Sequence, residues 1–119
     1  MRDLEQAVER LEQVLSASPH HSPWPQRVRH QLGGLDEVLA VPAQHHGDPA
    51  TEARAGHLDR ERSELRRRAH RLSGLLDGPA EVEALRTQLF RLAADLAHHA
   101  QRVNDLAYDG VSMEVGGSE

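Results

Sequence analysis

A run of residues between positions 82 and 106 limits what this chain can fold into more than any other feature. Its members recur at alternating steps of three and four, the spacing that keeps one face of an α-helix turned toward a neighbour. They are Val82, Leu85, Leu89, Leu92, Leu96, His99, Val103 and Leu106. A strand would alternate with a period of two, so the run predicts a helix from Pro79 to about Tyr108 that packs in a bundle.

Three further segments carry apolar residues at helical spacing. They cover about residues 3–16, 24–39 and 49–76, and Pro42 and the pair Asp77-Gly78 end the second and the third. Four amphipathic segments with short links predict one all-α domain, a four-helix up-and-down bundle, over residues 1–108. Residues 109–119 then form a short Gly-rich C-terminal tail.

Two features of the second segment call for an explanation. Gly33 and Gly34 interrupt it, and each glycine costs a helix about 1 kcal/mol relative to alanine. The sequence therefore predicts either a bend there or the close approach of another backbone. Trp24 opens the same segment, and a single indole beside a Leu- and Ala-rich interior is expected to cap one end of the core.

The composition narrows the class of function. Aromatic residues make up only 3%, and the 14 basic residues are all arginine, which favours helices over strands. The formal net charge of -5 argues against nucleic acid as the main partner. The chain has no cysteine, which excludes thiolate metal sites and Cys nucleophiles. No apolar run approaches the roughly 20 residues of a membrane span, so we expect a cytoplasmic protein with no membrane partner.

Nine histidines raise the question of a metal site, because His and carboxylate side chains on bundle helices hold di-iron centres. Three pairs of them are adjacent in sequence, and neighbours on a helix point about 100° apart, so only one of each pair faces a core. His99 is the member on the apolar run. It is either a core-edge histidine bonded to another side chain or to water, or a metal ligand. No carboxylate lies beside it on the same run.

Two more histidines complete the candidate set for a metal site. His70 points away from the apolar face of the third segment, so we expect it to face solvent, and His46 lies in a predicted loop at residues 42–50. A working metal or oxygen-binding protein would use His46, His70 and His99 with acids such as Glu52 or Asp105. No arrangement of catalytic residues stands out otherwise, and we expect no enzymatic activity.

An arginine-rich stretch in the third segment allows two interpretations. Its members are Arg60, Arg62, Arg66, Arg67, Arg68 and Arg71. Acidic residues are interleaved, and Glu64 is placed to pair with Arg67 or Arg68 at i+3 or i+4. We therefore predict a salt-bridged helix face, with a docking patch for an acidic partner as the alternative.

The C-terminal part of the chain carries the most specific pattern. The run from Leu96 to Gly117 contains His99-Ala-Gln-Arg, then Asp105-Leu-Ala-Tyr, and closes on a pair of glycines. This run resembles the ending of small bacterial hemerythrin-like (HHE-type) proteins. The Trp24-x-x-x-Val28 pattern and the pair Thr51-Glu52 are also similar to that family. The resemblance implies a hemerythrin-like four-helix bundle with iron as the candidate cofactor.

The chain departs from the family pattern at positions that would hold metal. Arg68 and Ala69 stand where the middle helix of the family carries Glu-His. Val103 stands where a metal-binding relative would carry a carboxylate, and Asp109 replaces a Glu in the tail motif. Only His99 carries over well. We therefore predict a degenerate metal site.

Three functions follow from these observations. The first is a metal-free hemerythrin-like bundle that acts as a structural or protein-interaction module. The second is an iron- or other metal-binding protein in oxygen or redox sensing. The third is a coiled-coil-like homo-oligomer, which its size in solution would test.

Overall fold

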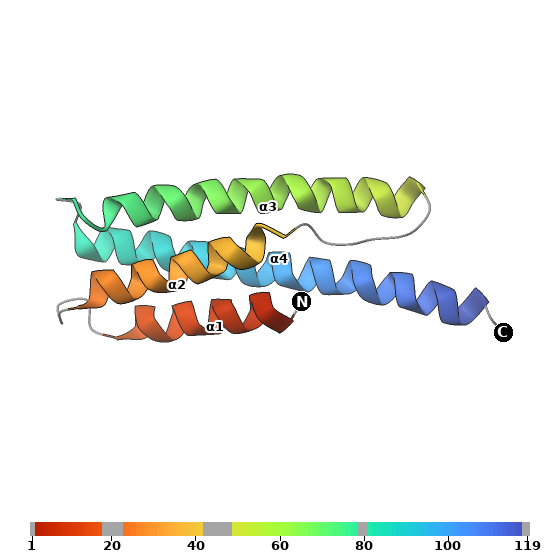
Figure 1. Cartoon of the computed structure of the whole chain (residues 1–119), viewed down its shortest axis with the longest axis horizontal. Coiled ribbons are helices and arrows are strands. Elements are labelled where there is room, and N and C mark those ends of the chain that lie inside the picture. Colours follow the sequence, from red (N-terminus) through yellow and green to blue (C-terminus); the bar gives the residue numbers. More distant parts are fainter. Residues whose placement is uncertain (1, 18–22, 42–48, 79–80, 118–119) are drawn as a thin grey trace.

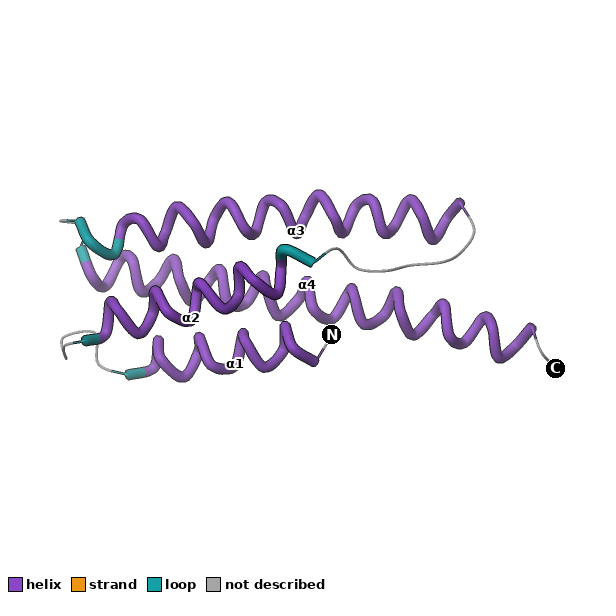
Figure 2. Tube along the Cα trace, viewed as in Figure 1, coloured by secondary structure: helices purple, strands orange, loops and turns teal. Residues whose placement is uncertain are grey.

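The chain folds into four α-helices in the computed structural model (Figure 1). They are α1 (Arg2–Ser16), α2 (Trp24–Leu39), α3 (Pro49–Leu75) and α4 (Val82–Gly117). The structure describes residues 2–17, 23–41, 49–78 and 81–117, and this part of the chain has no strand (Figure 2). The predicted all-α four-helix bundle is confirmed.

Each helix packs on two others. α1 contacts α2 and α4, and α3 contacts the same two helices, so α1 and α3 lie at opposite corners of the bundle. Successive helices run in opposite directions (Figure 1), which is the predicted up-and-down arrangement.

The helices differ in length, and this divides the molecule into two regions. α1 and α2 have 15 and 16 residues, whereas α3 and α4 have 27 and 36. The two long helices therefore continue past the other two (Figure 2). We call residues 49–58 of α3 and 103–117 of α4 the extension, and the rest of the bundle the four-helix region.

The apolar core follows this division. In the four-helix region all four helices contribute to one cluster, whose most deeply buried members include Leu11, Leu35, Leu89 and Leu92. A second, smaller cluster lies where the extension begins and consists of Ala55, Leu58, Val103 and Leu106. Among the described residues no helix is both long and apolar enough to cross a membrane.

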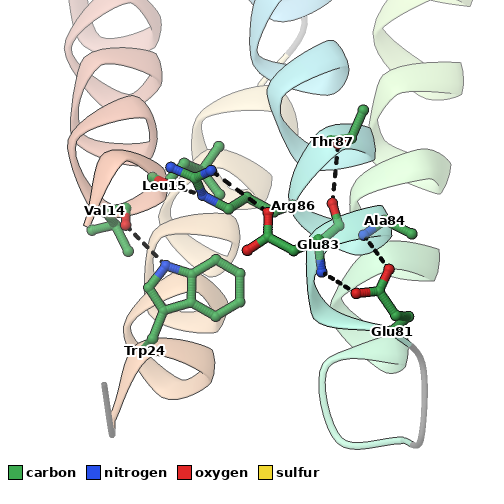
Figure 3. Close-up of polar contacts among 8 residues, drawn as sticks. All are labelled: Val14, Leu15, Trp24, Glu81, Glu83, Ala84, Arg86 and Thr87. Atoms are coloured by element: carbon green, nitrogen blue, oxygen red, sulfur yellow. Dashed lines mark hydrogen bonds and ion pairs between the residues drawn. The ribbon is translucent and has the colours of Figure 1, made fainter. Parts of the chain in front are cut away.

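Trp24 closes one end of the four-helix region, as predicted. Its side chain is only 2% exposed, and its Nε1–H donates to the carbonyl of Val14 at 3.0 Å (Figure 3). Close by, Nε of Arg86 donates to the carbonyl of Leu15 at 2.8 Å. The last carbonyls of a helix have no partner within the helix, so these two side chains satisfy the end of α1.

The start of α4 lies later than predicted. Both carboxylate oxygens of Glu81 accept from backbone N–H groups at the helix start, those of Glu83 at 3.2 Å and Ala84 at 3.0 Å (Figure 3). Glu81 thus caps a helix that begins at Val82. Glutamate is outside the usual set of capping residues, whereas proline is common at the first position of a helix, which is why the sequence favoured a start at Pro79. Pro79 itself lies outside the described residues.

The end of α4 was also predicted wrongly. The helix continues through Gly110 to Gly117 instead of ending near Tyr108. One glycine costs a helix about 1 kcal/mol, and adding residues to a helix that is already formed needs no new nucleation. Whether residues 1–108 form the domain and 109–119 a separate tail stays a prediction.

The two central glycines of α2 do not mark a close contact. α2 continues through both of them, and a Cβ atom added at Gly33 or Gly34 would meet no other atom within 4 Å. Of the two predicted alternatives, the close approach of another backbone is therefore wrong, and the bend stays a prediction.

Candidate functional site

His99 is the single polar side chain that is fully buried in the described part of the chain, with 2% of its surface exposed. It follows Leu96 by three residues and precedes Val103 by four, and both of these are buried. Helical spacing therefore turns His99 inward, while its neighbour His98 is exposed. Of this pair, the predicted member faces the core.

Glu61 of α3 lies against His99. Its Oε1 atom is 2.6 Å from Nδ1 of His99 and 2.7 Å from Nη2 of Arg102 on the next turn of α4. An ionised carboxylate only accepts hydrogen bonds, so Nδ1 of His99 carries the proton in this contact. We call Glu61, His99 and Arg102 the polar triad, and it ties α3 to α4. The prediction of a core histidine bonded to another side chain is confirmed.

The polar triad keeps Glu61 ionised. Partial burial by itself raises the pKa of Glu61, because the charged form loses water. The hydrogen bonds from Arg102 and His99, together with their charge, outweigh this effect and hold the pKa of Glu61 below its ordinary value of 4.5. The carboxylate is therefore the negative partner of the triad at neutral pH.

These three residues do not fit a metal centre. Metal centres in helical bundles need several carboxylate and His side chains that converge, and no such group of three is found in the described part of the chain. The guanidinium of Arg102 also lies on the same Glu61 oxygen that contacts His99. A cation at this oxygen would be repelled by that positive charge.

His70 lies on the opposite side of α3, between α3 and α2. Its side chain is 64% exposed, as predicted, and its Nε2 is 2.8 Å from Oδ1 of Asp36. Nε of Arg66 donates to the same oxygen at 2.9 Å. The hydrogen bonds from Arg66 and then His70 lower the pKa of Asp36 more than burial raises it. His70 is therefore engaged with α2 and lies apart from the polar triad.

The remaining predicted ligands are not brought together either. Glu52 is exposed near the start of α3. Asp105 accepts a hydrogen bond from Nε2 of Gln101 at 3.2 Å on its own helix. His46 lies outside the described residues. Within the described part, the structure does not assemble the predicted set around His99.

Sequence reasoning missed Glu61, although a signal for it was present. Glu61 follows Leu58 by three residues and precedes Leu65 by four, and both leucines are buried on α3. The same spacing identified His99 on α4. Glu61 was instead grouped with the acids interleaved in the arginine-rich stretch, which hid its place at the edge of the buried face.

The arginine-rich stretch forms ion pairs, as predicted, and among the described residues half of these pairs stay on α3 while the other half reach α2 or α4. Arg67 pairs with Glu64 on α3 at 2.6 Å. Arg68 reaches Asp95 of α4 at 2.7 Å, and Nη1 of Arg62 donates to the carbonyl of Leu39 at the end of α2 at 2.6 Å. Arg62 and Arg68 therefore fasten α3 to α2 and to α4.

Two open grooves lie along the junction of α3 and α4. One encloses about 350 Å³ and has Ala53 and Leu58 among its lining residues. The other encloses about 560 Å³ and extends to His98. His57 and Arg102 line both grooves, so the two meet on one face. Grooves between helices are surfaces on which a partner helix lies in many complexes.

Comparisons with models of protein families, with curated proteins and with solved structures find no match for this chain. The architecture and the geometry of the polar triad therefore carry the functional argument.

Proposed function

We propose that this chain is a non-catalytic, metal-free helical bundle that acts as a protein-interaction module. The polar triad carries the proposal. Arg102 lies on the carboxylate oxygen of Glu61 that would otherwise join His99 in binding a cation. A guanidinium neutralises that carboxylate without any metal, and the triad then serves to hold α3 against α4.

The surface of the two long helices supports an interaction role. α3 and α4 continue past α1 and α2, and the two grooves of about 350 and 560 Å³ follow their junction. The groove walls carry charges of both signs, including Arg54 and Asp105. Charged walls of this kind orient a partner and select against wrong ones.

The resemblance to small bacterial hemerythrin-like proteins belongs to this proposal. Val103 packs with Leu58 and Leu106 in an apolar cluster, at the position where a metal-binding relative would carry a carboxylate. A hydrocarbon side chain there suits a family member that has given up its metal. On this proposal the protein works in the cytoplasm. The cytoplasm is reducing and its proteins rarely form disulfides, and a chain without cysteine is compatible with it.

One observation favours a second candidate, a protein that binds iron or another metal in oxygen or redox sensing. Glu61 and His99 place a carboxylate and an imidazole side by side, and both are common ligands of iron. For this function Arg102 would have to move away, and further ligands would have to join Glu61 and His99.

Metal analysis of the purified full-length chain tests the proposal. We expect far less than one equivalent of any transition metal, and we expect a chelator to leave the thermal unfolding midpoint unchanged. His99→Ala and His98→Ala form a matched pair, since one side chain is buried and its neighbour is exposed. Near-stoichiometric iron that disappears in His99→Ala and persists in His98→Ala would establish the second candidate instead.

A further inference from the structure

α1 and α3 carry opposite net charge. α3 has seven arginines and four acidic residues, whereas α1 has four acidic residues and two arginines. The two helices do not pack on each other and run along opposite edges of the molecule (Figure 1). Positive and negative charge are therefore separated across the bundle, in a chain whose overall net charge is -5.

The positive side is a ridge along α3. Arg60, Arg67 and Arg71 are exposed and follow one another at intervals of seven and four residues, which places them on one face of the helix. The exposed Glu64 lies on the same face, where it pairs with Arg67 and is also attracted by the charge of Arg71. Within the described part of the chain, Arg60 and Arg71 take part in no ion pair. We call these three arginines the basic ridge.

The negative side is a matching ridge along α1. Glu5, Glu9 and Glu12 are exposed and follow one another at intervals of four and three residues. Glu5 accepts a hydrogen bond from Asn104. The carboxylates of Glu9 and Glu12 meet no cationic side chain among the described residues. We call these three glutamates the acidic ridge.

We propose that the basic ridge of one copy binds the acidic ridge of a second copy. This inference rests on the proposed function, because it names the partner of the interaction module. Opposite charge steers the two ridges together and selects them over other faces. Glu5 and Glu12 lie seven residues apart, as do Arg60 and Arg67, which is about 10.5 Å along either helix. Two charges on each ridge therefore come into register.

The position of the ridges decides the kind of assembly. Because they lie on opposite edges, a contact between two copies leaves one basic ridge and one acidic ridge unused. The contact is heterologous, so copies add in a row and do not close into a dimer. Exposed ion pairs are individually weak and are screened by salt. The association is therefore weak, and it depends on both protein concentration and ionic strength.

Sedimentation velocity of the full chain provides the first test. At an ionic strength of about 0.01 M the Debye length is about 30 Å, and at about 1 M it is about 3 Å. At low salt we expect the weight-average mass to rise steadily with concentration above the mass of the monomer. At high salt we expect the monomer. A monomer at every concentration in low salt overturns the proposal, as does a mass that salt leaves unchanged.

Charge reversal provides the decisive test. Arg60→Glu/Arg71→Glu makes both ridges acidic, and Glu9→Arg/Glu12→Arg makes both ridges basic, so each variant alone is expected to stay monomeric at low salt. Mixed in equal amounts, the two variants again offer opposite ridges, and the mixture is expected to recover the mass of the wild-type chain. A mixture that stays monomeric overturns the proposal.

A matched control distinguishes the effect of changing the basic ridge from the effect of changing the net charge of the chain. Arg27→Glu/Arg91→Glu changes net charge as much as Arg60→Glu/Arg71→Glu does, at exposed arginines of α2 and α4. This control is expected to associate like the wild type, and its loss of association would overturn the assignment to α3. Circular dichroism checks the fold of every variant. If the charge-reversed Arg60→Glu/Arg71→Glu chain does not fold, Arg60→Gln/Arg71→Gln takes its place.

Metal content is measured on the same samples. A metal-free monomer would overturn only this inference, and a metal-loaded chain that associates would overturn only the proposed function.

Discussion

The four-helix region and the extension share the same two long helices, yet they are packed differently. In the four-helix region α3 and α4 meet α1 and α2, and side chains such as Leu89 and Leu92 are 0% exposed. At the start of the extension the second cluster comes from α3 and α4 alone. The apolar spacing of α4 runs through the four-helix region and ends at Leu106, near the start of the extension. The four-helix region therefore has the larger core because more helices meet there and because the apolar run of α4 lies mostly within it.

The polar triad lies near the point where one region gives way to the other. Leu4 near the start of α1 and Leu39 at the end of α2 line a small cavity that also touches His99 and Val103. Beyond this point α3 and α4 lose the support of the other two helices. The hydrogen bonds of Glu61 to His99 and Arg102 hold the two long helices together there.

The largest expected change in the free energy of unfolding comes from replacing a buried leucine, and we compare one leucine from each region. Leu92→Ala leaves a cavity among four helices, and we expect it to lower the free energy of unfolding by about 4 kcal/mol. Leu106→Ala is expected to cost about 2 kcal/mol, because fewer neighbours surround it and the site can collapse. Urea denaturation of both variants measures the difference. Equal losses would show that the extension is packed as firmly as the rest of the bundle.

The next effect concerns the junction between the regions. Glu61→Ala leaves the buried Nδ1–H of His99 without its acceptor, and we expect a loss of about 1–3 kcal/mol in the free energy of unfolding. Glu64→Ala removes a carboxylate from the same helix that pairs only at the exposed surface. This control is expected to leave the denaturation midpoint unchanged. If both variants behaved alike, the polar triad would have no special role in stability.

A pH series sharpens the same comparison. The pKa of Glu61 is lowered in the folded state, so the unfolded chain binds more protons just below pH 4.5. The stability that Glu61 contributes is therefore fully present above about pH 4.5 and is lost as the pH falls through the folded pKa. We expect the gap in unfolding free energy between the wild type and Glu61→Gln to shrink from pH 7 to about pH 3.5. A gap that widens on acidification would contradict the assignment.

The smallest expected effect is a gain in the free energy of unfolding, and it comes from substitutions in the four-helix region. Gly33 and Gly34 are exposed on α2, and an added Cβ would meet no other atom within 4 Å. Gly33→Ala and Gly34→Ala should each raise the free energy of unfolding by about 0.5–1 kcal/mol. Amide hydrogen exchange should then slow in α2 more than in residues 49–58 of α3. A loss of stability would mean that the glycines are needed for a contact made in solution.

The sequence alone was sufficient for the helices and for which of their faces are buried. The leucines of α4, the inward position of His99 and the burial of Trp24 all follow from spacing and side-chain size, because an α-helix repeats every 3.6 residues whatever it packs against. The helix ends were less predictable. Glu81 as a cap and the continuation of α4 to Gly117 depend on local hydrogen bonds and on small differences in free energy.

Only the tertiary structure decided which residues meet. Glu61 and His99 are 38 positions apart in the chain, and Asp36 and His70 are 34 apart. No periodicity within one helix specifies the register between two helices, because that register results from the packing of all the side chains between them. The sequence therefore determined that His99 turns inward. The fold decided that it meets the carboxylate of Glu61 there, on which the guanidinium of Arg102 also lies.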